Sequence, residues 1–248
     1  MREPRKQRLD AALVARGWAD TRAKAQALVL AGKVFAAERR LEKPGMSVAA
    51  DQKLEVRGEA HPWVSRGGQK LAHALEHFAI DPGGLVALDI GASSGGFTDV
   101  LLARGAARVY AVDVGHGQLA WKLRGDPRVI VLERTNARYL TRAQIPDAVD
   151  LIVCDASFIG LATVLPAPLA LARPGGRLIA LIKPQFEVGR TRVGKRGVVR
   201  DPALHEEVCT RIRDWLERDM AWPVIGVVES PILGPEGNKE FLIAARRT

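Results

Sequence analysis

The sequence contains few cysteines, few aromatic residues and no long apolar segment. Only two cysteines, Cys154 and Cys209, occur among 248 residues, and aromatic residues make up 5% of the chain. Two cysteines at this spacing form neither a disulfide framework nor a metal site. No apolar run reaches the ~18 residues that a membrane span needs, and the N-terminal MREPRKQRLD lacks the apolar core of a signal peptide. These absences exclude a disulfide-rich secreted scaffold and a membrane-spanning protein, and we expect a reducing, cytoplasmic setting.

Acidic residues are also in the minority. The chain has 37 Lys and Arg against 28 Asp and Glu, which gives a net charge of +9. Residues 1–60 hold thirteen basic and eight acidic residues, so a quarter of the chain carries +5, more than half of the net charge. This balance favours a polyanionic partner. A solvated basic face is the alternative explanation for the charge alone.

Residues 1–60 have the pattern of a small separate domain. Apolar spacing predicts a helix over 9–16 and, behind an N-cap, a second helix over 21–31. Short strands are predicted at 33–35 and 53–56, with a Pro-Gly turn between them. Two helices and a small sheet make a barely sufficient core. We therefore predict an appended α+β domain.

Basic side chains cluster on this domain, and such a cluster binds phosphates with affinity but little sequence information. The candidate RNA-binding residues here are Arg5, Lys6, Arg8, Arg22, Lys24 and Lys33. The stretches RLDAALVARGWADTRAKAQALVLAGKVF, KPGMSV and DQKLEV resemble the RNA-binding module of ribosomal small-subunit protein four, over about residues 7–56. The resemblance implies an RNA-binding domain. Family members often have Asn-Gly in the hairpin where this chain has Ala37-Glu38-Arg39.

The pattern changes after residue 60. Pro62 disfavours a helix before it, and we predict that residues 61–66 are a linker in which Trp63 either packs on one domain or transmits RNA binding. Over residues 67–248 apolar strands alternate with helices, which predicts an α/β, Rossmann-like domain with a seven-stranded, mostly parallel sheet covered on both faces. The expected strands are 85–91, 108–115, 129–133, 150–155, 177–183, 223–230 and 239–247, and the expected helices are 69–78, 97–103, 161–172 and 205–219.

A glycine-rich turn follows the first expected strand. Its spacing is not G-x-G-x-x-G and no G-K-[ST] follows it, which argues against a dinucleotide site and excludes a P-loop. Asp113 ends the second strand, where a carboxylate can accept both ribose hydroxyls, unless it serves as a cap or turn former. Asn136 follows the third strand and can bond near an adenine. S-adenosylmethionine is therefore the leading cofactor. Its candidate ligands are Gly91, Ser93, Ser94, Gly95, Gly96, Phe97, Asp113, Asn136 and Asp155.

Four polar residues lie at the ends of predicted strands or at the start of a predicted helix, where α/β proteins commonly place catalytic side chains. Lys70 opens the helix before the first strand, Asp155 and Lys183 end the fourth and fifth strands, and Glu240 begins the last. Because strand ends gather above such a sheet, Asp155 and Lys183 should meet. A lysine kept partly neutral by burial and a second lysine can remove a ribose hydroxyl proton, while two carboxylates balance the charge. Each residue taken alone also has an ordinary interpretation: Lys70 and Lys183 could be surface lysines, and Glu240 could be a salt-bridge partner.

The constellation resembles the Lys-Asp-Lys-Glu tetrad of FtsJ-type 2′-O-ribose methyltransferases. The fuller similarity is to the TlyA family, through VSRGGQKL, ALDIGASSGGFTDVLL, AVDVGHGQLAWKLR, ERTNARYL, DLIVCDASFI, LIKPQFE and GNKEF. It covers nearly the whole chain and implies 2′-O-methylation of cytidine in ribosomal RNA, with S-adenosylmethionine as donor and ribosomal RNA or subunits as partner. It makes Lys70, Asp155, Lys183 and Glu240 catalytic. Some family members carry the name haemolysin, although this sequence offers no pore-forming element.

A second basic segment follows the fifth expected strand. Residues 189–200 read GRTRVGKRGVVR, which we interpret as a loop that clamps RNA phosphates, with a solvated loop as the alternative. Arg66, Lys195 and Arg196 complete the candidate RNA-binding residues.

The remaining reactive residues point to no other chemistry. Cys154 lies in an apolar strand and is expected in the core rather than as a nucleophile. The histidines do not form a metal cluster, so no metal is predicted. A pseudouridine synthase would need a catalytic aspartate in a mixed sheet rather than this glycine-rich turn. A non-enzymatic RNA-binding factor is the other alternative, and the intact tetrad argues against it.

Overall fold

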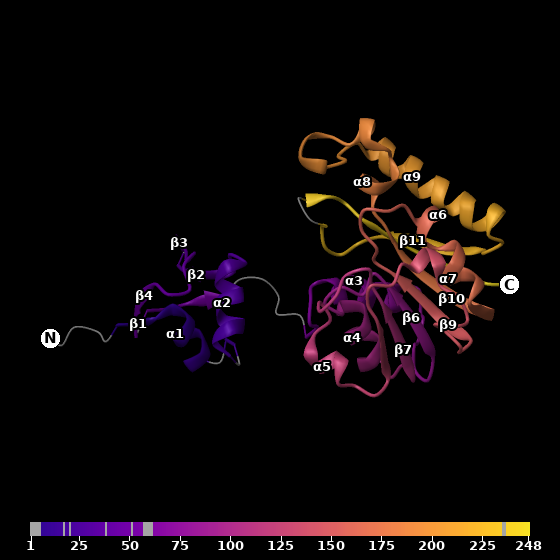
Figure 1. Cartoon of the computed structure of the whole chain (residues 1–248). Coiled ribbons are helices and arrows are strands. Elements are labelled where there is room, and N and C mark those ends of the chain that lie inside the picture. The colour runs from indigo at the N-terminus through magenta and orange to yellow at the C-terminus, as the bar shows by residue number, and fades with distance from the viewer. Residues whose placement is uncertain are drawn as a thin grey trace. The chain divides into compact units, whose positions relative to one another are not determined.

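The chain divides into two compact units, Met1–Ala60 and His61–Thr248. A computed structural model describes residues 6–16, 18–19, 21–37, 39–50, 52–56, 62–234 and 237–248. Figure 1 shows both units, each with its own helices and strands, and each has its own apolar core. Within the described residues, no helix has the length and apolar character that crossing a membrane requires.

The first unit packs two helices against short strands. The helices are α1 (Leu9–Ala15) and α2 (Arg22–Leu30), and their inward faces share one cluster of buried aliphatic side chains. Thr21 caps α2, because its Oγ1 accepts a hydrogen bond from the Lys24 amide at 3.2 Å. The strands are β1 (Lys6–Arg8), which pairs with β4 (Ser47–Ala49), and β2 (Val34–Ala36), which lies between β3 (Arg39–Arg40) and β5 (Glu55–Val56).

The hairpin between β2 and β3 forms without an Asn-Gly turn. Phe35 pairs with Arg40, and Ala36 pairs with Arg39 in antiparallel register. Ala37 has a φ of 51°, the left-handed region that Gly and Asn adopt more readily. The alanine therefore makes the turn at a cost of about 1–2 kcal/mol. Glu38 lies outside the described residues.

The second unit is built on one seven-stranded sheet in the order β11-β12-β10-β9-β6-β7-β8. Neighbouring strands from β10 to β8 are parallel, and β12 runs antiparallel to both β10 and β11. This confirms the predicted α/β class with a seven-stranded, mostly parallel sheet. The strands are β6 (Val86–Ile90), β7 (Arg108–Val112), β8 (Val129–Leu132), β9 (Val149–Cys154), β10 (Ala172–Ile182), β11 (Val224–Glu229) and β12 (Phe241–Arg246).

Helices cover both faces of this sheet (Figure 1). Consecutive strand residues such as Ala87 and Leu88 belong to different apolar clusters, as the two-residue period of a strand requires. One face packs against α3 (Gly67–His77), α4 (Gly96–Ala103) and α5 (Trp121–Arg124). The other packs against α6 (Leu161–Val164), α7 (Pro166–Ala170) and α9 (Pro202–Asp214). Shorter turns are α8 (Pro184–Glu187), the 3₁₀ turns Ala137–Tyr139, Arg190–Arg192 and Lys195–Gly197, and the π-helical turn Trp215–Asp219.

Two helix predictions need correction. The single helix expected over 161–172 is two short helices, because Pro166 has no amide hydrogen to continue α6 and instead starts α7. Ala172, expected in that helix, already belongs to β10. The helix expected from residue 205 begins at Pro202, behind Asp201, whose Oδ1 accepts a hydrogen bond from the Ala203 amide at 2.9 Å.

The segment expected as a linker packs on the second unit. The Val64 amide donates a hydrogen bond to Oδ2 of Asp99 at 2.8 Å. Trp63 is half-buried against the cluster under α3 and α4, and a Cβ on Gly68 would lie 2.4 Å from its ring. Residues 62–66 therefore pack on this unit, and His61 lies outside the described residues.

Candidate active site

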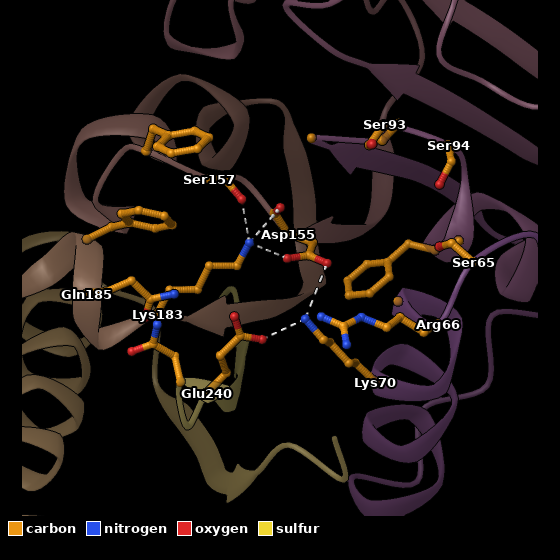
Figure 2. Close-up of a pocket in the computed structure, with 18 of the residues that line it drawn as sticks. Ser65, Arg66, Lys70, Ser93, Ser94, Asp155, Ser157, Lys183, Gln185 and Glu240 are labelled. Carbon is orange, nitrogen blue, oxygen red and sulfur yellow. Dashed lines mark hydrogen bonds and ion pairs between the residues drawn. The ribbon is translucent and has the colours of Figure 1, made fainter. Parts of the chain in front are cut away.

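The four residues of the predicted tetrad lie together at the carboxyl edge of the parallel strands. Asp155 follows β9 directly and Lys183 follows β10, so parallel neighbours bring them side by side. Lys70 comes from the first turn of α3, and Glu240 from the residue before β12. Figure 2 shows the four side chains pointing toward one another. Lys70, Lys183 and Glu240 are buried, with 5%, 7% and 1% of their surface exposed.

Asp155 contacts both lysines. Its Oδ1 lies 2.6 Å from Nζ of Lys183, and its Oδ2 lies 3.9 Å from Nζ of Lys70. Nζ of Lys70 also donates a hydrogen bond to Oε2 of Glu240 at 2.6 Å. Two ammonium groups and two carboxylates therefore alternate and balance one another, which buried charges require.

Lys183 has a partner besides Asp155 that the sequence analysis missed. Its Nζ donates hydrogen bonds to Oγ of Ser157 at 2.8 Å and to the Asp155 carbonyl at 3.2 Å, and it forms an ion pair with Oδ1 of Asp155 at 2.6 Å. These three contacts together fix the orientation of the ammonium group. Ser157 lies two residues beyond Asp155 in the same segment, but this spacing does not show that its side chain turns toward Lys183.

Gly234 lies directly against the carboxylate of Glu240. A Cβ on Gly234 would lie 2.2 Å from Oε1 of Glu240, so any larger residue there would displace the carboxylate. This Oε1 is buried and has no hydrogen-bond partner among the described residues. Gly234 therefore leaves room for the carboxylate of Glu240.

Two cavities meet at the tetrad. The first, of about 460 Å³, is lined by all four tetrad residues. The second, of about 540 Å³, lies toward β7 and β8 and is lined by Asp113 and Asn136. Both cavities share Gly91, Ser93, Asp155, Ser157 and Phe158 in their walls. A ligand in the second cavity can therefore place a group beside the lysines of the first.

Asp113 is already engaged by the backbone. Its Oδ2 accepts a hydrogen bond from the Ser93 amide at 2.8 Å, and its Oδ1 accepts one from the Gly115 amide at 2.7 Å. Each carboxylate oxygen keeps further acceptor capacity. Asp113 thus ties the glycine-rich turn to the loop after β7 and can still accept hydroxyl groups in the second cavity.

Asn136 both caps a turn and lines the second cavity. Its Oδ1 accepts a hydrogen bond from the Arg138 amide at 3.1 Å, which orients the side-chain amide. Gln118, which the sequence analysis did not single out, lines the same cavity and accepts a hydrogen bond from Oγ of Ser93 at 3.3 Å. The second cavity is therefore rimmed by short polar side chains from three successive loops.

The glycine-rich turn contributes unequally to the two cavities. Ser94, Gly96 and Phe97 line the first cavity, and Phe97 is also a buried member of the core. Gly95 lines neither cavity. Its φ is 95°, and a Cβ there would lie 2.2 Å from the side chain of Leu123, so this glycine permits α5 to approach the turn.

A buried carboxyl group lies beneath the turn. Asp89 is fully buried in β6, and its Oδ2 accepts a hydrogen bond from Oγ1 of Thr98 at 2.6 Å. Burial raises the pKa of Asp89 to about 7, and the negative charges of Asp155 and Asp113 add to the shift. The sequence analysis did not single out Asp89, because the pattern of an apolar strand does not show whether a polar residue within it is buried.

Phe158 lies exposed at the junction of the two cavities. Its side chain is 90% exposed and its φ is 65°, a strained value for a residue with a large side chain. Its ring centroid lies 5.2 Å from that of Phe186. The sequence analysis missed this aromatic pair, because Phe186 comes from a different strand end.

The predicted RNA-binding residues of the first unit lie mostly on its surface. Asp10 is fully buried, and its carboxylate accepts hydrogen bonds from Arg8, Arg22 and Gln26. The side chains of Arg8 and Arg22 remain 54% and 57% exposed. Lys6 and Lys24 are exposed and Lys33 is half-buried, while Arg5 lies outside the described residues.

The predicted RNA-binding residues of the second unit differ in position. Arg66 is exposed and lines the first cavity beside Lys70 (Figure 2). Arg196 is exposed and directly precedes Gly197, which lines the same cavity. The side chain of Lys195 lies outside the described part of the structure.

Cysteine and metal chemistry have little support here. Cys154 is fully buried, and burial raises the pKa of its thiol to about 12, so it is a core residue rather than a nucleophile. Within the described ranges, no three His, Cys, Asp or Glu side chains are placed to hold a metal ion.

Known proteins similar to this chain are methyltransferases and hemolysin-named proteins. Residues 63–247 match the family described as FtsJ-like methyltransferase. The 16S/23S rRNA (cytidine-2'-O)-methyltransferase TlyA of Mycobacterium tuberculosis is 50% identical over 243 residues, which cover 98% of this chain and 90% of that protein. A candidate rRNA methyltransferase of Bacillus subtilis, YqxC, is 47% identical over 96% of this chain and 85% of its own length. The solved structure of a candidate hemolysin from Streptococcus thermophilus is 41% identical, covers 99% of this chain and 89% of that one, and has a TM-score of 0.78.

Proposed function

Because this chain belongs to the FtsJ-like methyltransferase family, and within it to the TlyA family, we propose that it methylates the 2′-hydroxyl of cytidine in ribosomal RNA. The observation that carries the proposal is the position of Asp155, which contacts both tetrad lysines and lines both cavities. A donor site and an acceptor site therefore share the residue that orients the charged groups. Work on ribosomal RNA would place the protein in the cytoplasm.

S-adenosylmethionine fits the second cavity as the methyl donor. Asp113 presents spare acceptor capacity to the hydroxyls of a ribose, and Asn136 lies where the edge of an adenine would approach. The glycine-rich turn leaves room for a ligand close to the backbone. When bound, this cofactor supplies a methyl group on a positively charged sulfur.

The tetrad residues would prepare the acceptor hydroxyl. Lys183 pairs with the Asp155 carboxylate and donates hydrogen bonds to the Asp155 carbonyl and to Ser157. Once one of its protons has passed to solvent, its neutral amine can take the proton of a 2′-hydroxyl in the first cavity. Lys70 contacts Asp155 from the opposite side, and Glu240 holds Lys70 and keeps the buried charge balanced. Holding the 2′-hydroxyl between these groups also orients it toward the methyl group, and this positioning by itself lowers the barrier to methyl transfer.

The first unit would bind the RNA and bring it to the enzyme. Asp10 holds Arg8 and Arg22 in fixed positions while leaving more than half of each side chain exposed. Guanidinium groups fixed in this way suit phosphate oxygens, because less side-chain entropy is lost on binding. Arg66 and the basic loop at residues 189–200 would contact the RNA near the target ribose.

Methyl transfer from tritiated S-adenosylmethionine tests the proposal. We expect label in small-subunit or large-subunit ribosomal RNA, assayed separately, and we expect nuclease digestion to release it as 2′-O-methylcytidine. The matched control is Lys183→Ala, which should bind RNA and transfer no label. Salt-sensitive RNA binding without transfer by the wild type would favour a non-enzymatic RNA-binding factor, and label on a base would exclude ribose methylation.

A further inference from the structure

Asn238 joins the basic loop to the tetrad. Its side-chain Oδ1 accepts a hydrogen bond from the Val199 amide at 3.0 Å, and its Nδ2 donates one to the Gly197 carbonyl at 3.0 Å. Asn238 is 3% exposed and lines the first cavity together with Gly197. Glu240 is two residues further along and lines the same cavity. One short segment therefore presents a catalytic candidate and the anchor of the basic loop to one space.

The basic loop is fastened at both ends. At its start, Arg192 donates two hydrogen bonds to Glu207 of α9, at 2.8 and 2.7 Å. At its end, the Val199 carbonyl lies 2.9 Å from Nε2 of the buried His205. Asn238 is the contact that ties the loop to the segment of Glu240, whereas the other two contacts tie it to α9.

Arg196 lies at the exposed part of the loop, directly before the anchored residues. Its φ is 61°, a left-handed conformation that is unfavourable for arginine. Val198 and Val199, which follow Gly197, are buried with 6% and 3% exposure. Anchoring at Gly197 and Val199 therefore holds a strained, exposed arginine at the rim of the first cavity.

We infer that Asn238 is a positioning residue that fixes Arg196 to bind a phosphate of the RNA strand beside the target nucleotide. This inference rests on the proposed function, because it takes the occupant of the first cavity to be an RNA ribose. A ribose in a strand is flanked by phosphates, so a cation fixed at the rim sets how far the strand enters. The side-chain amide of Asn238 thereby links phosphate binding to the position of the hydroxyl near Glu240.

The salt dependence of RNA binding tests the inference, because replacing the neutral residue Asn238 should change it as much as removing the charge of Arg196. Each phosphate contact adds about 0.7–0.9 to the slope of log affinity against log salt concentration. With a fluorescein-labelled ribosomal RNA transcript, Arg196→Ala should weaken binding about five- to tenfold. It should also lower the magnitude of the slope by about 0.7–0.9, the amount that one phosphate contact contributes. We expect Asn238→Ala to lower the slope by the same amount, although it removes no charge. Asn238→Asp should also lower the slope. Its carboxylate still accepts from the Val199 amide but cannot donate to the Gly197 carbonyl.

The double variant Asn238→Ala/Arg196→Ala should have the slope of Arg196→Ala alone. Affinity for S-adenosylmethionine should stay within about twofold of wild type in every variant, since none of these residues lines the second cavity. Gln144→Ala is the matched control, because it removes another side-chain amide that accepts a backbone hydrogen bond, at Thr141, away from both cavities. Its slope should equal that of the wild type.

Two results would overturn the inference. One is a wild-type slope in Asn238→Ala and Asn238→Asp, and the other is a further fall in slope when Asn238→Ala is added to Arg196→Ala. The expected slope changes in the variants, together with no methyl transfer by the wild type, would instead contradict the proposed function. Methyl transfer by wild type together with unchanged slopes would contradict only the role of Asn238.

Discussion

Asp155 Oδ1 lies 2.6 Å from Nζ of Lys183, while the other oxygen of the same carboxylate faces Nζ of Lys70 at 3.9 Å. One carboxylate thus sets the positions of two lysines that come from distant parts of the chain. Its side chain is 21% exposed, compared with 8% for Lys183. Asp155 is therefore the tetrad member closest to solvent and to an incoming substrate.

Asp155→Asn should lower single-turnover methyl transfer on the order of 10²-fold at saturating cofactor and RNA, because a misplaced reactive group costs about that much. The amide keeps the shape of the side chain but cannot hold two ammonium groups. Rapid-quench measurement of labelled RNA gives the rate. A rate within threefold of wild type would mean that Lys183 and Lys70 are positioned by other contacts.

Lys183→Arg should be nearly as inactive as Lys183→Ala. A guanidinium keeps the positive charge but is not deprotonated in proteins, so it cannot take a hydroxyl proton. General-base assistance is typically worth 10²–10⁴-fold. Single-turnover rates for both variants, with cofactor and RNA affinity measured as controls, check this expectation. Near-normal rates in the arginine variant would leave Lys183 only an electrostatic role.

Asp113→Ala should weaken S-adenosylmethionine binding about 10- to 100-fold, which corresponds to the ~1.5–3 kcal/mol of hydrogen bonds to a charged group. The substitution also frees the Ser93 and Gly115 amides that Asp113 now holds. Isothermal titration calorimetry with the cofactor measures the change. Equal affinity in the variant and the wild type would remove Asp113 from the cofactor site.

Asp89→Asn should change how stability depends on pH. Burial raises the pKa of Asp89 from 3.8 to about 7, so its contribution to stability is full below pH 3.8 and is lost as pH rises through about 7. The asparagine cannot ionise and keeps an acceptor for Thr98. Relative to wild type, the variant should therefore gain stability between about pH 4 and 7, on the order of a few kcal/mol. Urea unfolding across this range measures it, and parallel pH profiles would contradict it.

Asp10→Asn should weaken RNA binding although it removes a negative charge and so makes the net charge more positive. The hydrogen bond from Arg8 is the main reason that the pKa of Asp10 lies well below its usual range, with Gln26 and Arg22 adding to it. The carboxylate therefore stays ionised and holds both arginines throughout the neutral range, and its stabilisation is lost only in strong acid. Fluorescence anisotropy with labelled ribosomal RNA measures the affinity. Tighter binding by the variant would show that net charge outweighs the positions of the arginines.

Much of the site could be predicted because its residues occur at strand ends. Asp155 and Lys183 follow apolar strands, and parallel neighbouring strands bring their carboxyl ends together whatever the loops do. Partners that come from loops could not be predicted. Ser157, Gln118 and Asn238 have no distinctive spacing, and each becomes a candidate only because the fold brings it to Lys183, Ser93 or the basic loop.

The sequence by itself determined the two-part organisation, the parallel sheet and the strand ends that carry polar residues, because apolar periodicity and glycine positions are local properties of the chain. Only the tertiary structure decided which charges neutralise one another. Lys70 and Glu240 are 170 residues apart in the chain and form a buried hydrogen bond, and Asp10 is sealed beneath two arginines. Burial and partner choice depend on the packing of distant segments, and they set whether a lysine or a carboxylate is a solvated surface group or part of a site.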